Sequence, residues 1–210
     1  MSVIKQSVPR AEKKLLTRKR LRDAGRRLFA ERGFAATQVG DIAKAAKVAH
    51  GTFYVHFDNR EALLDELLGD FNAALVAKLE RVWQPGAADN PHATAAKLAE
   101  VCLDHWHQDR GLVLAFAQRA GVDGNIESLR DGINPQVAGM LATRLTQVAK
   151  LAGRTLPDAE LLAQALLGMW MRVGLQYLFG GVSRKRAVEV LAMLSVGALG
   201  AALSTLTSPT

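Results

Sequence analysis

Residues 33–64 read GFAATQVGDIAKAAKVAHGTFYVHFDNREALL, and this stretch decides the fold. Thr37 is a good N-cap for a short helix whose inward positions are Val39, Ile42, Ala43 and Ala46. Phe53 and Phe57, four residues apart, anchor a second short helix over about 49–57. Asn59 is placed to cap a third helix that begins at Arg60. Two short helices joined by a tight turn predict a helix-turn-helix of the kind that reads DNA.

The second short helix carries polar side chains suited to nucleic acid. His50 and Thr52, near its start, can reach base edges, and Gly51 between them allows close backbone approach. Tyr54 and His56 sit where a hydroxyl and an imidazole can meet phosphate oxygens.

Charge is distributed unevenly along the chain. Residues 1–60 hold 14 Lys and Arg against 5 Asp and Glu, while residues 61–210 hold 13 against 15. The basic excess therefore lies wholly in the first 60 residues, which indicates a nucleic acid or an anionic membrane as the partner of that end. Residues 1–14 are expected to be a flexible basic arm that either follows the DNA backbone or merely aids solubility.

Length and composition predict an all-α protein. The 210 residues are 49% hydrophobic, and the chain is rich in Ala and Leu with 6 prolines and 6% aromatic residues, which favours helices over strands. The single cysteine, Cys102, excludes an intrachain disulfide and fits a reducing compartment, and the charged first 30 residues do not resemble a secretory signal. We therefore expect a cytoplasmic protein.

Helical periodicity and breaks at Gly, Pro and Asn divide the chain into helices. We expect a helix-turn-helix domain over 15–62 and a second helical domain over 63–210. The predicted helices cover 15–32, 37–46, 49–57, 60–83, 92–108, 111–120, 126–133, 136–151, 158–179 and 184–206, with Gly33 ending the first.

Residues 15–64 resemble the DNA-binding domain of the TetR (tetracycline-repressor) family. The resemblance rests on Gly33-Phe34, Thr37, Asp41-Ile42-Ala43, Ala46, Val48, Gly51-Thr52-Phe53-Tyr54, His56-Phe57, Arg60 and Leu63-Leu64. It implies a homodimeric, ligand-responsive transcriptional regulator, most often a repressor that a small molecule releases from a palindromic operator. The candidate DNA-contacting residues are Thr37, Gln38, Lys44, Lys47, His50, Gly51, Thr52, Tyr54, His56 and Arg60, with His50 and Thr52 contacting bases.

Three positions depart from the family pattern. Lys47 stands where the family usually has glycine in the turn, so the backbone there is expected to adopt a conformation that a side chain permits. Ala49 replaces the usual Ser or Thr cap of the second short helix. Gly40 replaces a basic or polar residue. Loss of the cap costs about 1 kcal/mol. We interpret Lys47 as a partial electrostatic replacement for the missing polar contact.

Cys102 and His105 raise the question of a metal site or a nucleophile. They lie three residues apart on the helix predicted over 92–108, but no CxxC or HExxH motif completes a ligand set, and no base is indicated for Cys102. We expect no metal, no cofactor and no enzymatic activity. Cys102 and Trp106 are expected in the core, with one histidine lining a cavity or facing solvent.

The helix predicted over 158–179 contains one charge between residues 161 and 183, Arg172. Since an unpaired buried charge is costly, Arg172 is expected either to form a salt bridge, within the domain or across a dimer, or to anchor a ligand that carries a carboxylate or another acceptor. The candidate ligand-binding residues are Trp106, Phe116, Arg119, Trp170, Arg172, Gln176 and Tyr177.

The last two predicted helices are too apolar to be exposed on every side. Small residues between 195 and 202 permit close helix approach, so we expect 158–179 and 184–206 to form a four-helix interface with a second copy. Residues 190–206 carry no charge but are short for a membrane span, and a buried helix is the preferred interpretation. Two alternatives stay open: a constitutive or architectural DNA-binding protein without an inducer, and a helical enzyme or membrane-associated protein.

Overall fold

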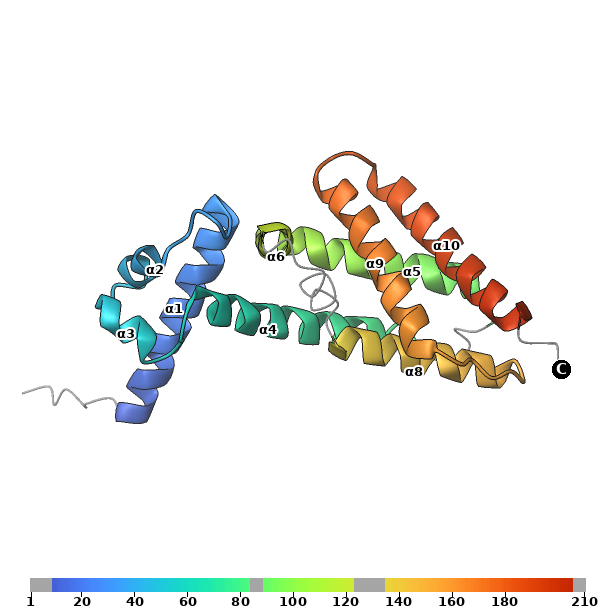
Figure 1. Cartoon of the computed structure of the whole chain (residues 1–210), viewed down its shortest axis with the longest axis horizontal. Helices are drawn as coiled ribbons and strands as arrows, with labels where there is room; N and C mark the ends of the chain where they lie inside the picture. Colours follow the sequence, from blue (N-terminus) through green and yellow to red (C-terminus); the bar gives the residue numbers. More distant parts are fainter. Residues whose placement is uncertain (1–8, 84–88, 123–134, 206–210) are drawn as a thin grey trace, which may run out of the picture. The chain divides into compact units, whose positions relative to one another are not determined.

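The computed structural model describes residues 9–83, 89–122 and 135–205. Within these ranges the chain forms helices and no strand, which confirms the all-α prediction (Figure 1). The helices are α1 (Arg10–Arg32), α2 (Val39–Ala45), α3 (His50–Tyr54), α4 (Arg60–Glu80), α5 (Pro91–Gln108), α6 (Arg110–Val122), α8 (Pro135–Leu151), α9 (Ala159–Leu178) and α10 (Arg184–Thr205). The helix predicted over 126–133 lies outside the described residues.

The chain divides into two compact units. One contains residues 1–70 and 111–124, and the other contains residues 71–110 and 125–210. This division differs from the predicted boundary between 62 and 63 in two ways. The first unit includes the first half of α4, and it also takes up α6, which is distant in sequence.

The N-terminal unit packs α1, α2 and α3 around an apolar centre in which Leu21, Ile42 and Phe53 are fully buried. Gly33 ends α1 with φ of 78°, and its N–H donates to the carbonyl of Phe29. That conformation is cheap for glycine because it has no Cβ. The prediction for Gly33 is therefore confirmed, and Phe34 returns to the core as expected, at 5% exposure.

Two helix starts differ from the predictions. α1 begins at Arg10, so residues 10–14 are helical and do not belong to a flexible arm. α2 begins at Val39 with Gln38 as its N-cap residue, and the Asp41 carboxylate accepts a hydrogen bond from the Gln38 N–H. The predicted N-cap of α4 is confirmed, because the Asn59 side chain accepts from the Ala62 N–H at 2.7 Å.

In the C-terminal unit, α5 packs against α10 and α8 packs against α9, and α9 and α10 form an antiparallel pair (Figure 1). One core cluster contains Ala99, Leu103, Ala187 and Leu191 from α5 and α10. A second cluster, mainly from α8 and α9, contains Ala142, Leu145, Ala163 and Leu166. The Arg184 guanidinium on α10 donates two hydrogen bonds to Asp104 on α5, which lowers the pKa of that carboxyl group.

Candidate nucleic-acid interface

The turn between α2 and α3 is built around Lys47. Its φ is 54°, in the left-handed region that side chains disfavour. The turn closes because the Val48 N–H donates to the Ala43 carbonyl at 3.0 Å. From α1, the Arg20 guanidinium donates to the carbonyls of Ala46 and Lys47. These bonds fix the angle at which α3 leaves the turn.

α3 is held by two buried rings and shows its other side to solvent. Phe53 is fully buried and Phe57, just past the helix, is 5% exposed, as the spacing predicted. His50, Gly51 and Tyr54 are exposed, and Thr52 is half-buried. The His50 and Tyr54 rings meet edge to face with centroids 5.5 Å apart. The outer face of α3 therefore presents an imidazole, two hydroxyls and an open backbone at Gly51.

α2 adjoins the start of α3. A Cβ at Gly40 would lie 3.7 Å from Nδ1 of His50, so the N-terminal turn of α2 and the start of α3 converge. Gln38 and Lys44 are exposed on the same short helix region, and Lys47 is exposed in the turn. Seven of the ten predicted DNA-contacting residues are thus at least partly exposed on α2, α3 or the adjoining turns: Gln38, Lys44, Lys47, His50, Gly51, Thr52 and Tyr54.

Val55 is also exposed beside α3 and was not predicted as a candidate. It is 67% exposed directly after α3. It falls between the buried Phe53 and Phe57, so the spacing of these two rings could have placed it outward. An exposed valine beside a reading helix offers an apolar contact to a thymine methyl group.

Thr37 was predicted to cap α2 and to contact phosphate, and the structure corrects both. Thr37 is fully buried. Its hydroxyl lies within hydrogen-bond distance of two carbonyl oxygens, 2.7 Å from that of Gly33 and 3.3 Å from that of Leu28. The side chain thus ties the end of α1 to the start of α2. It is not available to a phosphate in this structure.

Arg60 was also predicted to contact phosphate, and its guanidinium is occupied within the fold. It donates to the carbonyls of Phe34 at 3.1 Å and Thr37 at 2.7 Å, and more weakly to that of Ala35. It lies over the Phe34 ring, 4.5 Å from the centroid, and pairs with Glu61. Arg60 therefore holds the connection between α1 and α2, where chain carbonyls lack helical partners.

His56 stands at the edge of the interface, half-buried. Burial, and then the charges of Arg18 and Lys14, lower its pKa, so the imidazole is neutral at neutral pH. Its Nδ1 is buried and has no hydrogen-bond partner among the described residues. Because a phosphate oxygen of DNA only accepts, the neutral imidazole could contribute there only as an N–H donor through its other nitrogen, Nε2, and it brings no positive charge.

The strain at Lys47 gives a testable prediction. Lys47→Gly is expected to raise the free energy of unfolding by about 1 kcal/mol, because glycine adopts positive φ without a Cβ penalty. The same change is expected to weaken DNA binding, because it removes an exposed cation. Urea unfolding and DNA titration of one preparation check both signs. A loss of stability would show that the turn does not hold residue 47 in the left-handed region.

α6 contacts the end of α1 and the turn that follows it. The Gln118 side chain accepts a hydrogen bond from the Phe34 N–H at 2.9 Å, and Arg119 forms an ion pair with Asp65 on α4. Gly111, at the start of α6, lies so close to Ala30 that a Cβ there would clash. Phe116 and Arg119 belong to the N-terminal unit, whereas the other predicted ligand-binding residues belong to the C-terminal unit.

The remaining predicted ligand-binding residues lie in the C-terminal unit, in two different environments. Trp106 is buried against Gly174, and the Trp170 indole N–H donates to the Ser195 hydroxyl at 3.0 Å. The Tyr177 hydroxyl lies 3.4 Å from Nδ1 of His107. These aromatic residues join α5, α9 and α10 to one another. They therefore have packing roles that the sequence did not separate from ligand binding.

Arg172 and Gln176 are exposed, along with Gln164 and Gly168 of the same helical row. The expectation that Arg172 is buried is wrong. No ion pair of Arg172 is found within the described ranges, and its exposed guanidinium is open to solvent.

His105 and Cys102 are core residues. The Phe71 carbonyl can only accept, so Nε2 of His105, 3.0 Å away, carries the proton, and Nδ1 accepts from the Lys78 ammonium at 2.9 Å. Burial raises the pKa of the Cys102 thiol far above its usual range, which keeps it uncharged. Among the described residues no group of three or more His, Cys, Asp or Glu side chains is placed to hold a metal ion.

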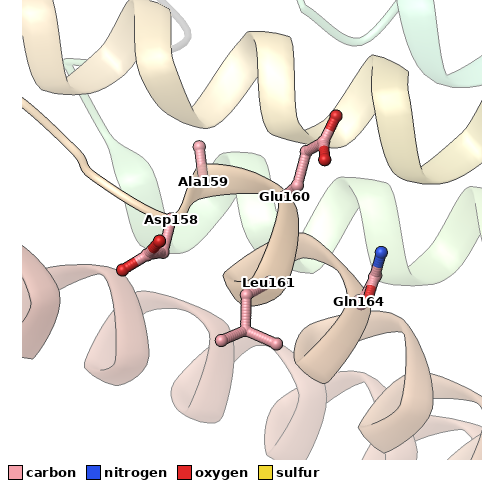
Figure 2. A pocket seen from close by; sticks show the side chains of 5 residues that line it. All are labelled: Asp158, Ala159, Glu160, Leu161 and Gln164. Atoms are coloured by element: carbon pink, nitrogen blue, oxygen red, sulfur yellow. The ribbon is translucent and has the colours of Figure 1, made fainter.

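A depression opens at the start of α9, lined by Asp158, Ala159, Glu160, Leu161 and Gln164 (Figure 2). All five belong to one end of a single helix, and Leu161 is 66% exposed. One helix end contributes the whole lining, which differs from the enclosed, mostly apolar pockets that usually hold small molecules. None of the predicted ligand-binding residues lines it.

α9 and α10 also expose apolar side chains: Leu161, Phe179, Met193 and Leu194. Of the helices in the described ranges, one, over Arg184–Ser204, is long and apolar enough to span a membrane, and 22% of its most apolar window is buried. Length and composition alone are weak evidence for a span, since core and interface helices have the same properties.

Comparisons with known proteins identify the N-terminal unit. Residues 21–67 match the family model described as bacterial regulatory proteins, tetR family. The transcriptional repressor KstR2 of Rhodococcus jostii (strain RHA1) is 44% identical over 69 residues, which is 33% of this chain and 34% of that protein. The transcriptional regulator UidR of Escherichia coli (strain K12) is 30% identical over 146 residues, 69% of this chain and 66% of that protein. The aligned parts thus span a third to two thirds of these relatives.

Solved structures extend the likeness in fold to most of the chain. FadR of Thermus thermophilus, a TetR-family repressor in complex with lauroyl-CoA, has a TM-score of 0.66 at 22% identity, covering 86% of this chain and 94% of that chain. FadR of Bacillus halodurans has the same score and identity, covering 85% and 97%. With the matched helix-turn-helix and its exposed reading helix, these findings show that the chain belongs to the tetR family of bacterial regulatory proteins.

Proposed function

We propose that the protein is a cytoplasmic transcriptional regulator, a repressor that binds a palindromic DNA site as a homodimer and leaves it when a small molecule binds the C-terminal unit. The observation that carries this proposal is α3, which Phe53 anchors from below while His50, Thr52 and Tyr54 face solvent. Five residues form a helix short enough to enter a major groove, and their side chains include donors and acceptors for base edges.

The remaining exposed residues support the same interface. Lys44 and Lys47 supply charge to phosphates beside the groove, and His56 supplies a hydrogen bond. Phosphate contacts fix the position of a reader, while base contacts determine its sequence preference. In this proposal Gln38 also faces the DNA backbone. It lies at the N-terminal end of α2, where the helix dipole favours a phosphate anion.

DNA titration at several salt concentrations tests the proposal. Binding through phosphates releases counterions, so affinity should fall steeply with salt, with a log–log slope of about 0.9 per contact. The double variant His50→Ala/Thr52→Ala is expected to lose sequence preference, at about 1–3 kcal/mol for each base contact, and to keep most of the salt slope. A wild-type affinity that does not change with salt would contradict DNA binding through this surface.

The second half of the proposal is a dimer formed through α9 and α10. Three glycines inside these helices, Gly168, Gly197 and Gly200, are exposed, and a Cβ on any of them would meet nothing within 4 Å. Each costs its helix about 1 kcal/mol relative to alanine, and the chain's own packing does not require it. Together with the exposed Met193 and Leu194, they fit close approach by a second copy.

Gly197→Arg is expected to convert the dimer to monomer, since the new side chain would stand in the interface. Because its Cβ has open space within the chain, the helical circular dichroism should be unchanged. Sedimentation velocity measures the result, with Gly139→Arg on α8, also exposed and open, as the matched control. A Gly197→Arg protein that still sediments as a dimer would place the interface elsewhere.

A ligand can shift the regulator only by binding one of its states more tightly. α4 is continuous between the two units, with Arg60–Asp70 in one and Phe71–Glu80 in the other. In this proposal it is one covalent route by which a change in the C-terminal unit reaches the reader. Arg172, exposed on α9 and unpaired within the described chain, serves in this proposal as a cross-dimer salt-bridge partner or as an anchor for an anionic ligand. Lauroyl-CoA, which one structural relative binds, is a sensible first probe of release from DNA.

A further inference from the structure

The first two turns of α1 project beyond the folded part of the N-terminal unit. Every residue from Arg10 to Leu16 is exposed, whereas Leu21, a few residues later, is fully buried. With a rise of 1.5 Å per residue, the segment from Arg10 to Arg18 is about 12 Å long. The residues from Arg10 to Leu16 are called the overhang below.

Two arginines show where the overhang lies relative to α3. Arg18 donates to the His56 carbonyl at 2.6 Å, just past the end of α3. Arg20 donates to the Lys47 carbonyl at 2.8 Å, just before its start. α3 therefore crosses α1 at this level, and the overhang begins directly beyond it, as Figure 1 also shows.

The side of the overhang that continues toward α3 carries cations. Arg10, Lys14 and Thr17 fall on the same helical row as the buried Leu21, and Lys13 lies beside that row. The charge of Lys14, after burial and the charge of Arg18, lowers the pKa of His56, which agrees with this side facing the end of α3. In the part of the chain that the structure describes, neither Lys13 nor Lys14 forms an ion pair.

We propose that Arg10, Lys13 and Lys14 bind phosphate groups of the DNA strand that borders the groove occupied by α3. The inference rests on the proposed function, because it requires α3 to lie in a major groove. That groove is about 12 Å wide, a distance comparable to the length of α1 from Arg10 to Arg18. Long, flexible side chains on α1 can reach a bordering strand even though α1 itself lies behind α3.

These contacts are to the backbone and carry no sequence information. They extend the protected length of DNA beyond the bases that α3 reads. The overhang is therefore a clamp on flanking DNA, and its contribution should disappear when the flanking base pairs are removed.

The test uses the duplex that the wild-type protein selects from random sequence, in full length and with its flanks trimmed. Lys13→Ala/Lys14→Ala is compared with Lys150→Ala/Lys185→Ala, which removes the same charge from exposed positions on α8 and α10. The overhang variant is expected to lower the log–log salt slope by about 0.9 for each lysine and each bound half-site, with unchanged sequence preference. The control variant should have the same salt slope and the same sequence preference as the wild type.

Trimming the flanks should weaken wild-type binding and leave the overhang variant nearly unaffected. An overhang variant with the wild-type salt slope, or with the same sensitivity to trimming, would overturn the inference while leaving the proposed function intact. A wild-type protein that shows no affinity for DNA at low salt would instead overturn the proposed function and this inference with it.

Discussion

Gly174→Ala is expected to lower the free energy of unfolding by about 1–3 kcal/mol, because it adds a methyl group to a filled contact between helices. A Cβ at Gly174 would lie 2.6 Å from Cε3 of Trp106 and closer still to Cζ3. Trp106 is 7% exposed, and its indole is rigid, so it cannot swing aside as a flexible chain would. α9 approaches α5 this closely only because residue 174 has no side chain.

Gly139→Ala is the matched control, and its sign should be opposite. Gly139 lies inside α8, is exposed, and a Cβ there meets nothing, so alanine should raise stability by up to about 1 kcal/mol. Urea unfolding at fixed protein concentration measures both variants. Trp106→Phe in the Gly174→Ala background should recover part of the loss, since the smaller ring leaves room. Equal signs for the two glycine variants would contradict the close packing of α5 on α9.

Arg60→Ala is expected to cost about 2 kcal/mol of stability, which is the size of hydrogen bonds from a charged group to carbonyls that would be left partly unsatisfied. The guanidinium serves the carbonyls of Phe34 and Thr37 and lies over the Phe34 ring. Arg60→Lys should recover little of this, because an ammonium cannot reproduce the planar fork.

The control for Arg60 is Lys44→Ala, which removes an exposed cation from α2 and should change stability by less than about 0.5 kcal/mol. Thermal or urea unfolding without DNA separates a structural role from a phosphate contact. If Arg60→Ala is as stable as wild type and loses only DNA affinity, the original interpretation of Arg60 as a phosphate contact is correct. The hydrogen bonds of Arg60 to backbone carbonyls would then contribute little to stability.

Local patterns predicted the parts of the fold that local physics determines. The spacing of Phe53 and Phe57 located α3 but predicted its end at 57, whereas the helix ends at Tyr54 and Phe57 is buried just beyond it. Gly33 marked the end of α1 because its position requires a left-handed backbone. The expectation that a side chain at position 47 requires a backbone conformation that side chains favour is wrong, because Lys47 has φ of 54°, in the left-handed region. The start of α1 was missed, because residues 10–14 form a helix without contributing any buried side chain.

The hydrogen-bond and ion-pair partners of individual side chains were harder to predict, because they depend on residues distant in sequence. Thr37 and Arg60 have side chains that often bind phosphate. In this structure both instead donate hydrogen bonds to backbone carbonyls at or just after the end of α1. No pattern within 30 residues identifies Gln118 as the partner of the Phe34 N–H. Similarly, nothing near Arg119 indicates its ion pair with Asp65, and so the sequence placed it with Arg172 in a pocket.

The central claim is that two reading helices, one from each copy, enter neighbouring major grooves on the same side of a duplex. Sequence selection by the purified wild-type protein from a pool of random duplexes tests it most directly. The account predicts enrichment of two inverted half-sites with centres about one helical turn or a small multiple of it apart, and loss of that enrichment in His50→Ala/Thr52→Ala. Recovery of a single unpaired half-site, or of no enriched sequence, would contradict it.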